Sequence, residues 1–229
     1  MQKNQSTTQK FHTPAPVSAV LDIPAGRIRF IAADRTDTTV EILPADASKG
    51  RDVKAAEQTE VVYGDGVLRI QTTAAKNRIL GASGSLEVTV QLPAGSHIEA
   101  KAASAELRGV GRLGDVTFEG AQATVKLDET ASARLTTAAG DIRLGRLGGP
   151  AEISTQKGDI HITEAVHGTL TLRTEHGNIT VGAAHTVSAT LDAGTTYGRI
   201  HNALRNTDTT AGLNIHASTA HGDITARSL

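Results

Sequence analysis

Histidine is the first residue type in this sequence that could do chemistry. The chain has nine histidines, and an imidazole can bind a transition metal or carry a proton near neutral pH. Two imidazoles without a third histidine or a carboxylate make a poor zinc site, so solvated turn histidines are the favoured interpretation. We therefore predict no metal-binding residues and no cofactor. Three pairs occupy matching positions in repeated segments: His161 with His201, His176 with His221, and His167 with His185.

Carboxylates recur with similar regularity and raise calcium as a second possibility. Asp141, Asp159 and Asp223 align with Asn178 and Arg199 at one repeated position. Glycine–aspartate coils can bind calcium through oxygen ligands. Here the required Gly-Gly-x-Gly-x-Asp pattern is absent, and Arg199 places a cation among the acids. We therefore expect each Asp or Asn to accept backbone hydrogen bonds in its turn.

Groups that could catalyse a reaction are sparse. Glu152, Glu164 and Glu175 form no convincing pair for acid–base work on a glycoside. No Gly-x-Ser-x-Gly, phosphate-loop or His-Glu-x-x-His motif occurs, and the chain has no cysteine. Aromatic residues make up 2% of the chain, which disfavours a site that stacks a sugar or a base on a ring. We predict no catalytic residues and no enzyme activity.

Length, charge and hydropathy narrow the choice of partner. The 229 residues can bury one large all-β core or two smaller ones. The formal net charge of −1 gives no basic footprint for nucleic acid. No segment approaches the roughly 18 consecutive apolar residues of a membrane span, and residues 1–10 are too polar for a signal peptide. We expect a cytoplasmic protein that binds a protein partner or a second copy of itself.

A repeat in the second half supplies the elements that must position these residues. Gly-Asp-Ile occurs three times, Gly-Asn-Ile and Gly-Arg-Ile occur once each between them, and successive glycines are 18, 19, 21 and 24 residues apart. The isoleucines of these motifs, with the equivalent apolar residues of earlier segments, form one apolar column. A second apolar column lies seven residues before the matching residue of that column, or nine residues before Ile200 and Ile224. Its members are Ala100, Phe118, Leu135, Ile153, Leu172, Leu191 and Ile215.

This spacing predicts a β-solenoid whose short coils each hold two strands and stack about 4.8 Å apart. Alternation along each strand should turn one column inward and its neighbours outward. An antiparallel meander or sandwich is the alternative, but columns of identical residues are natural only when equivalent positions stack in register. The predicted inward residues are Ile142, Ile160, Ile179 and Ile200, and the predicted outward residues are Arg143, His161, Thr180 and His201.

If the coils stack in the order of the sequence, the histidine pairs can be placed. His161 and His201 would be two coils apart, about 9.6 Å, which is too far to share a zinc ion. The pair His176 and His221 would also be two coils apart, whereas His167 and His185 would lie on adjacent coils and could touch. The final coil, Gly222–Leu229, would form the open end of the stack. Its unpaired backbone predicts self-association there.

The first half of the chain is less regular. We predict a disordered tail at residues 1–10, a strand-rich part at 11–95 that caps the stack or adds irregular coils, and the solenoid repeats at 96–229. Tyr63–Val67 predicts a hairpin, because Asp-Gly supplies the positive φ that its turn needs. Lys49–Thr59 has helical composition and could form one or two helical turns or a charged loop. We favour a solvated surface excursion there.

Tandem Gly-Asp-Ile strands in a chain rich in Ala, Thr and Gly, closing on Gly222–Arg227, resemble a bacterial family of β-strand-repeat proteins. That family is catalogued as a putative adhesin domain of unknown function. The resemblance extends from Phe11 to Leu229 and implies an actinobacterial type of source, with no cofactor or catalytic residues. We interpret the chain as a non-enzymatic interaction or scaffold module. The alternative is a carbohydrate-active β-helix enzyme or a polysaccharide-binding protein.

Overall fold

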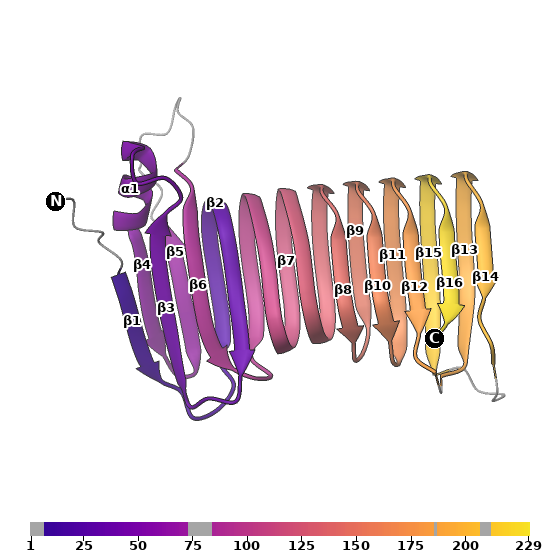
Figure 1. Cartoon of the computed structure of the whole chain (residues 1–229), viewed down its shortest axis with the longest axis horizontal. Coiled ribbons are helices and arrows are strands. Elements are labelled where there is room, and N and C mark those ends of the chain that lie inside the picture. Colours follow the sequence, from indigo (N-terminus) through magenta and orange to yellow (C-terminus); the bar gives the residue numbers. More distant parts are fainter. Residues whose placement is uncertain (1–6, 73–83, 186, 207–211) are drawn as a thin grey trace.

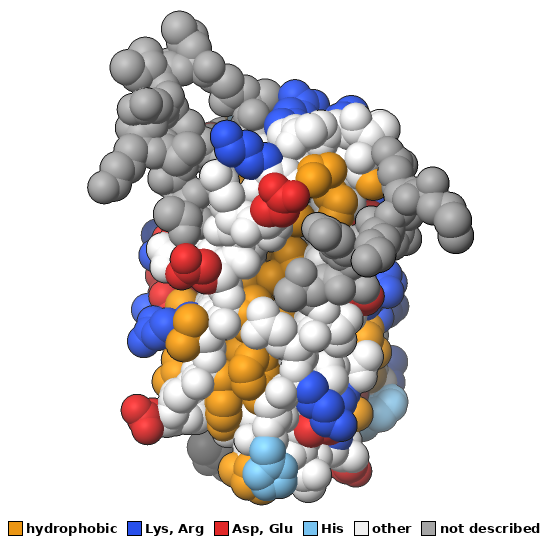
Figure 2. Space-filling view, turned by 90° about the vertical axis from the view of Figure 1, so that its left-hand side faces the viewer, with side chains coloured by type: hydrophobic (Ala, Val, Ile, Leu, Met, Phe, Trp, Pro, Cys, Tyr) orange, Lys and Arg blue, Asp and Glu red, His pale blue; other side chains and the backbone are white. Residues whose placement is uncertain are grey.

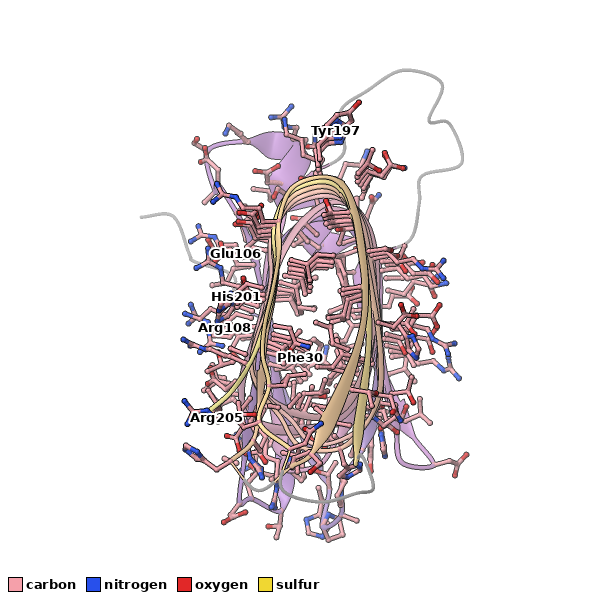
Figure 3. The ribbon with its side chains drawn as sticks, turned by 90° about the vertical axis from the view of Figure 1, so that its right-hand side faces the viewer. Phe30, Glu106, Arg108, Tyr197, His201 and Arg205 are labelled. Atoms are coloured by element: carbon pink, nitrogen blue, oxygen red, sulfur yellow. The ribbon has the colours of Figure 1, made fainter. Side chains whose placement is uncertain are left out.

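The strands of the chain form one 16-stranded sheet that winds around a flattened core. The computed structural model describes residues 7–72, 84–185, 187–206 and 212–229. Successive coils lie side by side along one long axis (Figure 1). Seen along that axis, they superimpose as a narrow oval with two walls and a filled interior, in which Phe30 is buried (Figure 3). The predicted all-β solenoid is therefore confirmed.

The coils of the second half stack in parallel and in register. Ile160 in β10 (Ile160–Ala165) pairs with Ile142 in β8 (Ile142–Leu147) and with Ile179 in β12 (Ile179–Ala183). The predicted column is confirmed, and the antiparallel alternative is wrong. Each corner requires glycine: Gly158 has φ +148°, and a Cβ there would lie 2.2 Å from the carbonyl oxygen of Gly140.

The opposite wall of these coils contains β9 (Ala151–Lys157) and β11 (Gly168–His176), which pair in parallel. The long strand β7 (His97–Ala139) continues both walls toward the N-terminal half. Its Val125 pairs with Ile142 on one wall, and its Leu135 pairs with Ile153 on the other.

The last coils do not stack in the order of the sequence. β15 (Leu213–His221) and β16 (Ile224–Ser228) lie between the coil of β11 and β12 and a terminal coil (Figure 1). The terminal coil consists of β13 (Ala189–Tyr197) and β14 (Ile200–Ala203). Ile224 thus pairs with Ile179 on one side and Ile200 on the other. The prediction that the final segment forms the open end is wrong.

The side chains that point inward explain this order. In the inserted coil, Leu213, Ile215 and Ile224 are at most 1% exposed. The terminal coil instead carries Asn202 at the level of Ala226. Burying a side chain as large as Ile stabilises the fold by ~1.5–3 kcal/mol, so the more apolar coil is favoured inside. Ile200 was predicted to be buried, but it is 46% exposed because no coil covers it.

The register also corrects the second apolar column. Ile215 and Leu191 are level with Leu170, whereas Ala217 and Ala193 are level with Leu172. These two alanines lie seven residues before the isoleucines of their own coils. The offset between the two columns is therefore seven residues in these coils as well. The predicted offset of nine was wrong, because the column position is occupied by alanine, which a search for large apolar residues passes over.

The N-terminal half closes the other end of the stack. β2 (Ser18–Ala33) passes from one wall to the other, pairing in parallel with β7, with β5 (Val67–Thr72) and with β6 (Leu86–Pro93). Beyond them the pairing becomes antiparallel, with β3 (Asp37–Pro44) on β6, β1 (Thr7–His12) on β3, and β4 (Thr59–Gly64) on β5. Apolar side chains gather in the middle of this end (Figure 2). The rings of Phe11 in β1 and Tyr63 in β4 pack against the core, with centroids 5.4 Å apart.

Local predictions in this half have mixed outcomes. The hairpin is confirmed, with Asp65 at φ 51° and Gly66 at φ 77° between β4 and β5. The expected surface excursion is instead α1 (Gly50–Glu57), whose Asp52 is 3% exposed and accepts a hydrogen bond from the Ser85 N–H at 2.9 Å. The segment Thr7–Lys10, expected in a disordered tail, pairs with β3. The rest of that tail lies outside the described residues, and the boundary near residue 95 stays a prediction.

Candidate interaction surface

The repeated acids and amides form a continuous ladder of hydrogen bonds along one edge of the stack. Side-chain oxygens of this ladder accept backbone N–H groups, but each donor belongs to the next coil rather than to the same turn. The ladder ends at Arg199, whose side chain has no acceptor to offer. Its steps are Asp159 N–H to Asp141 Oδ1 at 3.0 Å, Asn178 N–H to Asp159 Oδ1 at 2.7 Å, Asp223 N–H to Asn178 Oδ1 at 2.8 Å, and Arg199 N–H to Asp223 Oδ1 at 2.8 Å.

The coil order changes which histidines meet. His176 and His221 are adjacent, with stacked rings whose centroids are 4.7 Å apart, and Tyr197 continues the stack 4.9 Å from His221. His161 and His201 are three coils apart rather than two. No ring contact joins His167 to His185 in the part of the chain that the structure describes. The described residues contain no group of three His, Asp or Glu side chains placed to hold a metal ion.

The outer surface of the wall formed by β9, β11, β15, β13 and the level parts of β7 contains several hollows. We call it the β11 face. Two of its hollows, of about 430 and 340 Å³, meet at Thr171. A third, of about 660 Å³, lies nearer the N-terminal half and is bordered by Ile23, Lys101 and Thr136. All three are open and shallow, which suits a broad contact better than an enclosed small molecule.

The stacked two-wall fold and its repeats can be compared with known proteins. The family model described as Toastrack DUF4097 matches residues 20–227. The chain belongs to the Toastrack DUF4097 family. No curated protein matches this Toastrack chain.

Solved structures resemble this Toastrack chain over nearly its full length. A protein from Bacteroides fragilis, described as a putative adhesin, is 13% identical with a TM-score of 0.50, and the match covers 98% of each chain. A putative cell adhesion protein from Clostridium sporogenes is 10% identical with a TM-score of 0.41, covering 98% of this chain and 100% of that one. A putative lipid binding protein from Parabacteroides distasonis is 11% identical with a TM-score of 0.45, covering 99% and 98%. At such identities the likeness concerns the fold alone.

Several charges on the β11 face of the Toastrack chain are partnered. Nε of Arg134 lies 3.4 Å from Oε2 of Glu152, and Nδ1 of His216 lies 3.3 Å from Oδ2 of Asp192. Between these pairs stand short hydroxyl side chains such as Thr171 and Ser154. The face is therefore polar, and Arg173 of β11, an exposed cation that lines the hollow beside Thr171, forms no ion pair with another described residue.

The three glutamates considered for catalysis do not converge. Glu152 pairs with Arg134 on the β11 face. Oε1 of Glu164 lies 3.7 Å from Nε of Arg146 on the opposite wall. Glu175 lies in β11, near its corner. This separation offers no two carboxyls across one substrate position.

Two half-buried aspartates near the N-terminal end carry shifted pKa values. Hydrogen bonds from Arg35 and Lys10 lower the pKa of the Asp37 carboxyl to about 2, and these contacts tie β1 to β3. Hydrogen bonds from the hydroxyl and N–H of Ser48 lower the pKa of Asp46 to about 2. The lowered pKa of each carboxyl means that these hydrogen bonds stabilise its ionised form.

The described part of the chain contains no helix long and apolar enough to cross a membrane.

Proposed function

We propose that this Toastrack chain is a non-enzymatic interaction module that binds a protein partner through the β11 face. The observation that carries the proposal is the clustering of three shallow hollows on one rigid sheet face, with Thr171 shared by two of them. Short hydroxyls and locally paired charges cost little to desolvate compared with isolated charges. The description of the Bacteroides fragilis structure as a putative adhesin agrees with this proposal.

A polysaccharide ligand or substrate is the second candidate, and the exposed rings of His176, His221 and Tyr197 are the observation that favours it. Sugars stack on ring faces. In this stack, however, the rings cover one another, which leaves only the outer faces of His176 and Tyr197 for a sugar. A protein partner on the β11 face is therefore the better supported function.

A pair of matched variants tests the proposal. Thr171→Arg places a long cation on the β11 face, and Thr180→Arg places the same cation on the opposite face of the same coil. Both positions are half-buried and point outward. Quantitative cross-linking in cells of the source bacterium should identify a partner that wild type and Thr180→Arg bind and that Thr171→Arg loses. Loss with Thr180→Arg alone would contradict the proposal.

Polysaccharide binding and cleavage are measured in the same set of variants. A polysaccharide array should give no binding, and a reducing-end assay should detect no cleavage. Cleavage of any polymer would overturn the non-enzymatic assignment. The cytoplasmic location and the actinobacterial type of source remain predictions from the sequence, and cell fractionation tests the first of them.

A further inference from the structure

The terminal coil leaves inward-facing side chains uncovered. Ile200 is 46% exposed, whereas Ile224 at the same level one coil further in is 1% exposed. Tyr197, at the corner of this coil, is 67% exposed. Leu191 and Ala193 of β13 are only partly buried. Figure 3 looks onto this end and shows the oval outline of the coil, with Tyr197 at its upper corner.

The backbone of the terminal coil is also open. β13 pairs only with β15, and β14 only with β16, among the described strands. Asn206 covers the first residue of the β13 edge, accepting from the Ala189 N–H at 2.9 Å and donating to its carbonyl oxygen at 3.1 Å. The remaining residues 190–203 contain no Lys or Pro, the residues that commonly protect an edge from pairing. Open strand edges beside uncovered apolar side chains are suited to receive another coil.

We propose that two copies of this chain associate tail to tail through their β13–β14 coils. β13 runs toward the Tyr197–Gly198 corner and β14 runs away from it, so the two strands are antiparallel. A two-fold axis along the long dimension of the oval therefore sets β13 of one copy antiparallel to β14 of the other. Ile200 lies two residues after the corner, and Thr195 lies two residues before it. Each large Ile200 would then face the smaller Thr195 of the second copy.

The same axis joins the aromatic stacks of the two copies. His176, His221 and Tyr197 form a stack that ends with one free ring face on Tyr197. The two-fold axis brings the two Tyr197 corners together, so each ring covers the other. The second two-fold axis in the end plane would instead set this tight corner against the opposite end of the oval, where β13 begins and β14 ends. The first axis instead brings the identical corners of the two copies together.

Head-to-tail growth does not match the two ends. The N-terminal end is built from β1 on antiparallel β3 and β4 on antiparallel β5, with α1 beside them (Figure 1). Its outline differs from that of the other end, where β13 and β14 pair in parallel with the strands of the preceding coil. A two-fold tail-to-tail contact closes after two copies, whereas a head-to-tail contact would produce filaments.

The size of the contact predicts a weak complex. A strand of nine residues is about 30 Å long and the coil is about 10 Å thick, which gives an end of roughly 300 Å². Stable interfaces bury about 800 Å² per partner. The dimer should therefore be reversible and concentration-dependent. It uses the end of the stack and leaves both β11 faces free, so its test is independent of the proposed function.

Sedimentation across a concentration series tests the association. Wild type should shift from monomer toward dimer as concentration rises. Tyr197→Lys should raise the dissociation constant at least about tenfold, since the aromatic contact at the shared corner is lost and two cations meet. The control, Thr225→Lys, puts the same charge on the outer wall one coil further in and should leave the constant within about twofold. Thermal unfolding of each variant confirms that it is folded.

Engineered cysteines test the orientation, because the chain has none of its own. Tyr197→Cys should give a disulfide-linked dimer on mild oxidation. His161→Cys, on the outer wall away from the end, should give far less. A wild type that stays monomeric at the highest concentration would overturn the proposal. So would Tyr197→Lys associating as wild type does, growth beyond dimers, or equal cross-linking by the two cysteine variants.

Discussion

The backbone N–H of Asp223 donates to Oδ1 of Asn178 at 2.8 Å, although 45 residues separate the two. This contact places the C-terminal coil directly on the coil of β11 and β12, where the intervening segment would otherwise lie. The next step of the ladder, from the Arg199 N–H to Asp223 Oδ1, places the intervening segment on the outer side of the C-terminal coil. The coil of β15 and β16 therefore lies inside the stack, with another coil on each side.

Removing one step of the ladder should destabilise the fold locally. Asp159→Ala leaves the Asn178 N–H without its acceptor at 2.7 Å, and we expect a loss of about 1–2 kcal/mol in the free energy of unfolding. Arg199→Ala is the matched control, because the Arg199 side chain ends the ladder and accepts nothing. Urea denaturation measures both. Equal losses for the two variants would show that the ladder is not the cause.

Isoleucines of one column should differ in their tolerance of a charge. Ile160 is 1% exposed and Ile200 is 46% exposed. Ile160→Asp buries an unpaired carboxylate and should cost about 4 kcal/mol, whereas Ile200→Asp should cost about 1 kcal/mol or less. Denaturation midpoints compare the two. Similar costs would contradict the position of Ile200 at the open end.

The attachment of β1 should weaken in acid. The pKa of Asp37 is lowered to about 2 in the fold, so its contacts stabilise β1 fully above about pH 4, the range of an unfolded aspartate. That stabilisation is lost as pH falls from about 4 to about 2. Hydrogen exchange of the β1 amides, corrected for the intrinsic pH dependence, should accelerate over this window. In Asp37→Asn the corrected rate should be high at every pH and show no such step.

Metal ions should leave the stability unchanged. No trio of candidate ligands lies together in the described residues, and a ligand of the native state raises stability by mass action. Thermal unfolding with chelator, zinc or calcium should give the same midpoint within a degree or so. A rise of several degrees with zinc would point first to the stacked pair His176 and His221.

The repeat of the coils could be predicted from the sequence because each coil must place glycine at a corner and isoleucine inside. Gly158 and Ile160 illustrate both requirements. The order of the last coils was missed because their motifs are nearly equivalent, and chain order is the simplest assumption. Two residues carried the signal: Arg199 cannot extend a ladder of acceptors, and Asn202 is polar at an inward position. Both mark their coil as the terminal one.

The interaction surface was less predictable than the fold. The sequence indicated outward Thr, Arg and His, but not which wall would be hollowed. The hollow at Thr171 depends on short neighbours contributed by strands far apart in the chain, such as Gly194 and Ser218. The pairing of His176 with His221 likewise follows from the coil order, which no local pattern reveals.

Hydrogen exchange of the last two coils tests the central claim, which is that the C-terminal coil lies between β11–β12 and β13–β14. The N–H of Ile224 donates to the Arg199 carbonyl oxygen at 2.9 Å, so β16 is covered on its outer side. At a concentration where the protein is monomeric, amides of residues 213–228 should exchange more slowly than those of residues 189–203. Faster exchange in 213–228 would mean that the coils stack in the order of the sequence, and would contradict the account.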